Sequence, residues 1–194
     1  LAQTALVQVV ASTPHLIPVV HGWVHQNHAP QGAKKSEFGH PRPDAEVELA
    51  RAFTKMDDLF GAQLMPAFVT PWNRLDAIYL PPLAALGYRV VSTFNPRPVA
   101  QPVPGLLAIN THIAPIDWRG ARGLVDADHL VADATQQLRA RRMGETDQSE
   151  PFGYLTHHLV HTPEIWNFSR AFLSEMLEGG AQNCTLAKAI KDIS

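Results

Sequence analysis

The stretch Val19–His28, VVHGWVHQNH, carries three histidines within eight positions and directly follows the apolar run at residues 16–20. That run predicts a buried strand that ends where the histidines begin. Imidazole is the commonest transition-metal ligand in proteins, because its neutral nitrogen is available near pH 7. His21 and His25 are four residues apart, so a helical turn or a tight loop would direct both rings at one ion. The chain has ten histidines in all, so surface or capping histidines are the alternative.

The rest of the chain alternates between segments that predict strands and segments that predict helices. This alternation favours an α/β fold with a parallel sheet or barrel and helices outside it. The length of 194 residues is enough for one domain, 1–194, with a full core. Residues 27–43 are rich in Pro, Gly, His and charge and predict a long functional loop. The predicted strands are 16–20, 64–69, 88–92, 106–109 and 152–157; the predicted helices are 1–11, 44–60, 75–86, 126–142, 163–178 and 186–193.

Composition excludes several classes of partner. A formal net charge of −2 gives no electrostatic reason to expect nucleic acid or an anionic membrane. The sequence has no apolar run near the roughly 20 residues that a membrane-spanning helix needs. Cys184 is the only cysteine, which excludes an intrachain disulfide. With no secretory signal in the chain as given, these features favour the cytoplasm; they leave the oligomeric state open.

Several chemistry-bearing residues follow predicted strands. His21, the Pro71-Trp72 pair, His112 and His157 each lie at or just after a strand end. In parallel α/β folds, the carboxyl ends of the strands gather the functional site. We therefore expect these residues to share one rim.

Taken in order, these motifs resemble the polysaccharide deacetylase family, carbohydrate esterase family four. The resemblance spans most of the chain and implies a distorted, incomplete parallel (β/α) barrel. Members of the family use two histidines four apart as ligands of a divalent metal, and His21 and His25 match that pair. The resemblance is closest to a bacterial branch of the family whose members carry a long loop after the histidine pair. In that loop His28 is a candidate pocket residue or additional ligand.

The resemblance also assigns the later motifs. The segment Phe68–Arg74 matches a sugar-binding motif through Pro71 and Trp72. Asp117-Trp118 matches an Asp-Trp pair that forms a second wall of the pocket, and Leu155-Thr156-His157 matches a motif whose histidine is the general acid.

Simpler interpretations exist for some of these residues. Trp72 and Trp118 could be ordinary packing aromatics, and Asp117 could be a turn residue. If the strand continues to His157, alternation sends His157 and His158 to opposite faces, so only one of them can face the site.

Two departures from the family pattern concern the acidic and basic groups of the site. The family has two adjacent aspartates on its first strand, one as base and one as third metal ligand, and no such pair precedes His21. Asp57-Asp58 lies within a predicted helix and does not fit, so we expect the motif and the first strand upstream of Leu1. Val69 replaces the arginine that usually holds the catalytic aspartate, and Arg74 is the candidate to take its place.

The function implied by the resemblance is metal-dependent removal of acetyl groups from a saccharide. Zinc is the expected metal, although a site of two histidines and a carboxylate also suits cobalt, nickel or iron. The candidate catalytic residues are His157, Arg74 and Asp117. Two alternatives remain: a non-catalytic carbohydrate-binding relative, if the aspartate base is missing, and a metal-dependent hydrolase of another C–N bond, such as a cyclic amide.

Overall fold

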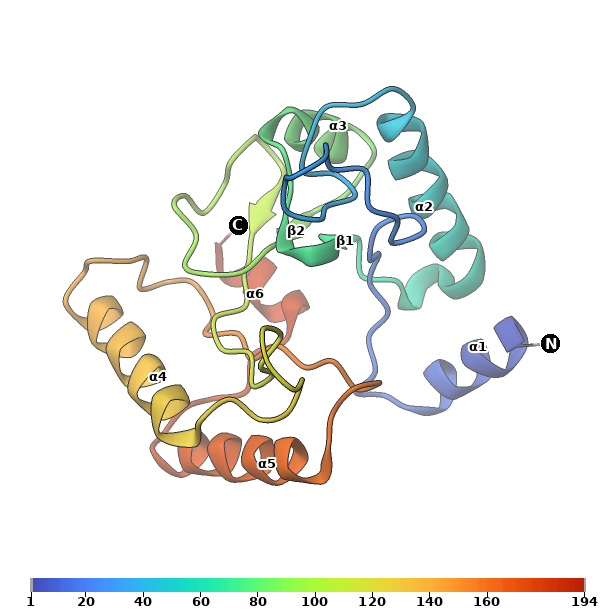
Figure 1. The fold of residues 1–194 in the computed structure, drawn as a ribbon. Coiled ribbons are helices and arrows are strands. Elements are labelled where there is room, and N and C mark those ends of the chain that lie inside the picture. The colour runs from blue at the N-terminus through green and yellow to red at the C-terminus, as the bar shows by residue number, and fades with distance from the viewer. Residues whose placement is uncertain (1, 194) are drawn as a thin grey trace. The chain divides into compact units, whose positions relative to one another are not determined.

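The computed structural model describes residues 2–193, and the side chains of residues 5–191 (Figure 1). Its helices and strands are α1 (Ala2–Ser12), α2 (Ala45–Phe60), β1 (Ala67–Val69), α3 (Leu80–Ala85), β2 (Val90–Ser92), β3 (Leu107–Ala108), α4 (Ala127–Arg142), α5 (Pro163–Glu178) and α6 (Leu186–Ile193). Short 3₁₀ turns cover Gly61–Gln63, Pro71–Asn73 and Ala77–Tyr79. The chain forms two compact units. The first comprises Leu1–Thr93, Val99–Ile109 and Ile190–Ser194; the second comprises Phe94–Pro98 and Asn110–Ala189.

The first unit contains a parallel sheet of three strands in the order β1-β2-β3. Ala67 pairs with Val90, and Val90 in turn pairs with Leu107. On the other side of β1, Val20 forms a single parallel bridge with Phe68. The parallel α/β arrangement predicted from the sequence is therefore present. The described strands form an open sheet and do not close into a barrel.

Two predicted strands are reduced to single bridges. The strand predicted at residues 16–20 pairs only at Val20, because Pro18 has no N–H group with which to extend the ladder. In the second unit, the strand predicted at 152–157 pairs only through Tyr154 with Ile113. It ends in a turn in which the His157 carbonyl accepts the Val160 N–H at 2.9 Å.

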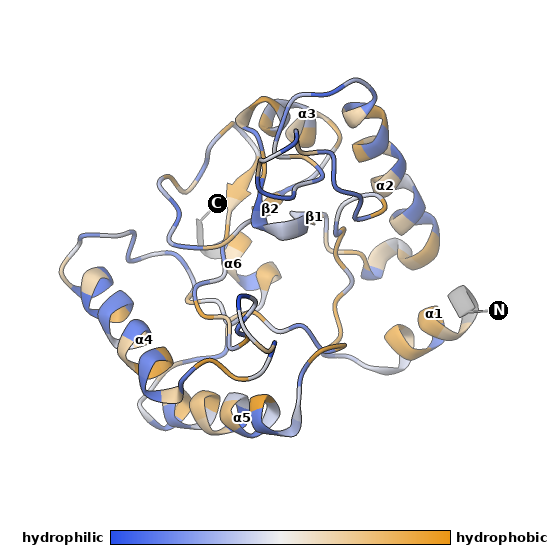
Figure 2. Ribbon diagram, viewed as in Figure 1, coloured by the Kyte–Doolittle hydropathy of each residue, from blue (hydrophilic) through white to orange (hydrophobic). Residues whose placement is uncertain are grey.

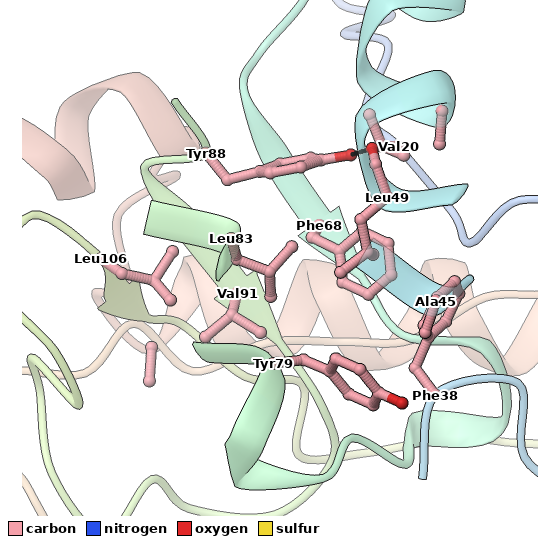
Figure 3. Close-up of a cluster of buried hydrophobic side chains, with 12 residues drawn as sticks. Val20, Phe38, Ala45, Leu49, Phe68, Tyr79, Leu83, Tyr88, Val91 and Leu106 are labelled. Carbon is pink, nitrogen blue, oxygen red and sulfur yellow. Dashed lines mark hydrogen bonds between the residues drawn. The ribbon is translucent and has the colours of Figure 1, made fainter. Parts of the chain in front are cut away.

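The core of the first unit lies between the sheet and helices α2 and α3 (Figure 3). Phe68 and Val91 from the strands pack in one cluster with Leu49 of α2 and Leu83 of α3. The buried Tyr88 hydroxyl donates to the Leu49 carbonyl at 3.1 Å, which satisfies its polar group inside the cluster. Figure 2 shows the corresponding division of α2 into apolar and polar sides.

In the second unit, α4 and α5 provide a smaller core. Leu130 and Ala134 of α4 are buried with Ile113, and Phe168 and Phe172 of α5 pack against this cluster. Of the helices within residues 2–193, none combines the length and the apolar character needed to cross a bilayer.

The ends of α4 and α5 agree with the sequence predictions, whereas the helix predicted at 75–86 is limited to α3, Leu80–Ala85, which follows the 3₁₀ turn at Ala77–Tyr79. Asp126 accepts the His129 N–H at the start of α4, and the Thr162 hydroxyl accepts the Ile165 N–H at the start of α5. Asp44 precedes α2 as expected, but it adopts a left-handed conformation with φ of 64° and makes no side-chain cap. Pro81-Pro82 does not interrupt a helix; it lies in the first turn of α3, where missing N–H groups cost little.

Candidate metal centre

His21 and His25 lie on a tight loop of the first unit rather than on a helix. Gly22 and His25 both have left-handed backbones, with φ of 69° and 55°. The two imidazole rings are 5.1 Å apart between centroids and are tilted by 53°. Metal–nitrogen bonds of about 2.0–2.1 Å at a tetrahedral angle put two imidazole centroids about 5 Å apart. The spacing of the pair therefore fits a shared ion.

A backbone contact determines which ring nitrogen of His21 carries the lone pair. Its Nδ1 is 3.0 Å from the carbonyl oxygen of Val69, at the end of β1. Because a carbonyl only accepts, this contact makes Nδ1–H the donor and leaves the lone pair on Nε2. Ligating histidines are commonly held by such a contact from the other ring nitrogen. The pKa of the His21 imidazole is lowered, mainly by partial desolvation. The ring is therefore neutral near pH 7.

The ring of His25 packs against Trp72. Their centroids are 4.0 Å apart, with a tilt of 53°. Trp72 follows β1 in a 3₁₀ turn and has a left-handed backbone, with φ of 53°. The end of β1 and the turn after it therefore contact both histidines. The carbonyl of Val69 binds His21, and the indole of Trp72 contacts His25.

Glu37 lies beneath the histidine loop and is only 1% exposed. Its Oε1 accepts the Val24 N–H at 2.8 Å, and its Oε2 accepts the Trp23 N–H at 3.2 Å. These two N–H groups are successive and lie between His21 and His25 in the chain. A Cβ atom on Gly22 would come within 2.1 Å of Glu37 Oε2, which explains why glycine occupies that position.

Three other predicted site residues, Arg74, Pro71 and His28, also belong to the first unit. Arg74 Nη1 donates to the Lys35 carbonyl at 2.8 Å, so it holds the long loop. Arg74 also lines an open hollow of about 560 Å³ with Lys34, His40 and other residues. Pro71 is buried beside the Gly22 position. The backbone of His28 donates to the Ser36 carbonyl at 2.8 Å, while the residue itself is exposed.

The structure places the later motifs in the second unit. Trp118 and His157 lie edge to face, with ring centroids 4.9 Å apart. The Nε2 of His161 accepts the backbone N–H of His157 at 3.1 Å. The carboxylate of Asp117 accepts the N–H groups of Arg119 and Gly120, both at 3.0 Å, and so stabilises a turn.

The site residues therefore fall into two groups. Pro71, Trp72 and Arg74 belong to the same unit as the histidine pair, whereas Asp117, Trp118 and His157 form a second group in the other unit. The convergence of both groups at one rim stays a prediction.

Within the described part of the chain, no group of three or more His, Cys, Asp or Glu side chains is placed to hold a metal ion. The loop brings together two imidazole rings, those of His21 and His25. The carboxylate oxygens of Glu37 contact backbone N–H groups of the same loop.

Sequence reasoning missed two buried glutamates. Glu37 belongs to the charge-rich loop predicted at residues 27–43, and the structure buries it beside Phe38. In the second unit, Glu150 is 1% exposed and accepts the backbone N–H groups of Arg97 and Asn110, each at 2.9 Å. Its Oε2 also lies 3.2 Å from Nε2 of the fully buried His112.

Comparisons with known proteins give a likeness in fold alone. No protein-family model and no curated protein matches this sequence significantly. A crystal structure described as a "putative polysaccharide deacetylase from Mycobacterium smegmatis" matches 88% of this chain with a TM-score of 0.53 and 18% identity. This chain spans 59% of the length of that protein. At such identity the likeness shows a similar fold.

Proposed function

We propose that this chain is a metal-dependent hydrolase that removes acetyl groups from a saccharide. The observation that carries the proposal is the histidine loop. His21 and His25 stand at a spacing that fits one ion, and the contact with Val69 leaves a ligating nitrogen free on His21. The similarity in fold to a structure described as a polysaccharide deacetylase supports the same class. The incomplete barrel of that family stays a prediction for this chain.

The metal belongs to the proposal as well. His21 and His25 would hold a divalent ion, with Zn²⁺ as the expected metal and Co²⁺, Ni²⁺ or Fe²⁺ as other metals that suit imidazole ligands. When bound, such an ion supplies an activated water and polarises the acetyl carbonyl. A third ligand and the catalytic base, aspartates in the family, are not among the matched residues of this chain.

The chain's own residues would bind the sugar and move a proton. Trp72 and Trp118 offer flat apolar faces suited to a saccharide ring. His157, when protonated, would donate a proton to the departing amine, a step that typically contributes about 10²–10⁴-fold in rate. Asp117 would act by holding the turn that follows it, through the N–H groups of Arg119 and Gly120. Arg74 would hold the long loop through Lys35.

Metal uptake and acetate release together test the proposal. The His21→Ala/His25→Ala double variant should lose at least tenfold in Zn²⁺ affinity, measured by competition with a chromogenic chelator. The matched control is His15→Ala/His129→Ala, because both of those histidines are exposed and neither belongs to the loop that carries His21 and His25. Unchanged Zn²⁺ affinity in the first double variant would rule the site out.

Substrate assays separate the alternatives. Acetate released from N-acetylated or O-acetylated oligosaccharides by the zinc-loaded protein supports the deacetylase. Saccharide binding without acetate release supports the non-catalytic relative. Hydrolysis of cyclic amides instead of acetylated sugars would assign another C–N bond.

A further inference from the structure

Glu37 is a charged residue that is buried in the first unit. Burying a carboxylate is costly unless hydrogen bonds compensate for its lost hydration. Here each oxygen accepts one backbone N–H, from Val24 at 2.8 Å and from Trp23 at 3.2 Å. Hydrogen bonds to an ionised acceptor are about twice as strong as bonds between neutral groups. The carboxylate therefore fixes the middle of the histidine loop firmly.

The loop has little freedom to adopt another path. Gly22 has a φ of 69°, and a Cβ atom there would lie 2.1 Å from Glu37 Oε2 and 2.4 Å from Pro71 Cγ. The backbone thus contacts the carboxylate and the proline ring closely. Before Gly22 in the chain, His21 binds the Val69 carbonyl, and after it His25 packs on Trp72. A displaced loop would change the positions of both rings.

The segment that carries Glu37 is itself held in place. Ser36 and Phe38, its neighbours, are buried with it. The backbone of Phe38 accepts the Asp76 N–H at 2.8 Å, and Asn27 Oδ1 accepts the Ser36 N–H at 3.0 Å. The carboxylate is thus anchored from the far end of the long loop, and it holds the near end.

We infer that Glu37 is a positioning residue: it sets the orientation of His21 and His25 by binding the two N–H groups between them, and it is not itself a metal ligand. The metal part of this inference rests on the proposed function. The orientation of the two rings does not, because it can be measured without metal.

The test compares two buried glutamates. Glu37→Gln keeps the size of the side chain but places an NH₂ group where one N–H now finds an acceptor. Glu150→Gln is the matched control, because Glu150 is equally buried and also accepts two backbone N–H groups, but in the second unit. Circular dichroism checks that both variants are folded.

The first readout is the imidazole ¹H–¹⁵N spectrum of the metal-free protein, assigned with the His21→Ala and His25→Ala variants. We expect His21 to be the Nδ1–H tautomer in the wild type and in Glu150→Gln, and a mixture of tautomers in Glu37→Gln. A loss of stability alone would not change the tautomer of a folded protein. Wild-type His21 and His25 signals in folded Glu37→Gln would overturn the inference.

The second readout is Zn²⁺ affinity. Loss of a residue that orients ligands typically weakens metal binding by about 10–100-fold, and we expect that loss in Glu37→Gln and unchanged affinity in Glu150→Gln. Equal Zn²⁺ affinity in Glu37→Gln and the wild type would also overturn the inference. A wild type that fails to bind Zn²⁺ would contradict the proposed function, while the spectra would still decide the role of Glu37.

Glu37→Asp keeps the inference testable if Glu37→Gln does not fold. It retains the charge but shortens the reach by one methylene, so it cannot keep both bonds at their present lengths. We expect an intermediate loss of Zn²⁺ affinity and a partial change of the His21 tautomer. Wild-type behaviour in both readouts would count against a positioning role.

Discussion

The two units each contain a buried glutamate that accepts two backbone N–H groups, but they present their histidines in opposite ways. In the first unit, Glu37 lies beneath a loop whose His21 and His25 are exposed. In the second unit, Glu150 faces His112, which is fully buried and also accepts the Gly153 N–H on Nδ1 at 3.0 Å.

The difference separates a candidate binding site from a structural cluster. Both ring nitrogens of His112 have protein partners, Gly153 and Glu150, so this imidazole has no lone pair left for a ligand. Among the residues that the structure describes, His21 has one ring-nitrogen contact, from Nδ1 to the Val69 carbonyl. A buried carboxylate alone therefore does not mark a functional site. What distinguishes the histidine loop is a carboxylate that holds the backbone next to an exposed imidazole.

The largest expected effect is on the second unit. Glu150→Ala should lower the free energy of unfolding by about 3–5 kcal/mol, because it leaves the Nε2–H of buried His112 and two backbone N–H groups without an acceptor, at about 1–3 kcal/mol for each unsatisfied group. Urea denaturation followed by circular dichroism measures this. The exposed Glu145→Ala is the control and should change stability by no more than about 0.5 kcal/mol. Equal effects of the two substitutions would show that the cluster is not structural.

A smaller effect is expected from glycine substitution in the histidine loop. Gly22→Ala adds a strained left-handed backbone and a Cβ that collides with Glu37 and Pro71. Gly32→Ala adds a similar strain, with φ of 82°, but nothing lies within 4 Å of its Cβ. Gly22→Ala should therefore cost about 1–3 kcal/mol more than Gly32→Ala. Indistinguishable unfolding midpoints would mean that the loop can move away from Glu37.

Acid should weaken the second unit through Asp147. The Ser149 hydroxyl, and then Arg97, lower the pKa of Asp147 from 3.8 to about 2. Because the folded pKa lies below the ordinary value, the stabilisation is complete above about pH 4 and is lost as the pH falls through 2.

The stability difference between the wild type and Asp147→Asn should accordingly shrink between pH 5 and pH 2. Thermal unfolding at several pH values measures it, with the exposed Asp58→Asn as control. A stability difference that stays constant over this pH range would show that the contacts of Asp147 with Ser149 and Arg97 do not cause it.

The sequence predicted helices better than strands. Apolar periodicity and capping residues placed α4 and α5 within a residue of their observed ends, because helical hydrogen bonds are local. The strands were predicted too long: residues 16–20 pair only at Val20, since pairing depends on a partner that is distant in the chain and on Pro18 having no donor.

The sequence likewise indicated the part of the candidate site that depends on neighbouring residues, and not the part that depends on distant ones. The spacing of His21 and His25 indicated a pair, and the structure places the rings 5.1 Å apart. Glu37 could not be found this way, because its contacts are with backbone N–H groups 13 and 14 residues earlier, and backbone groups leave no trace in the sequence. The tautomer of His21 likewise depends on a carbonyl 48 residues later in the chain.

The most direct measurement is a crystal structure of the protein soaked with Zn²⁺, with anomalous data collected at the zinc absorption edge. We expect one strong anomalous peak about 2.0–2.1 Å from Nε2 of His21 and from a ring nitrogen of His25, with Glu37 still bound to the loop backbone. A peak on other histidines, or none between these two rings, would contradict it.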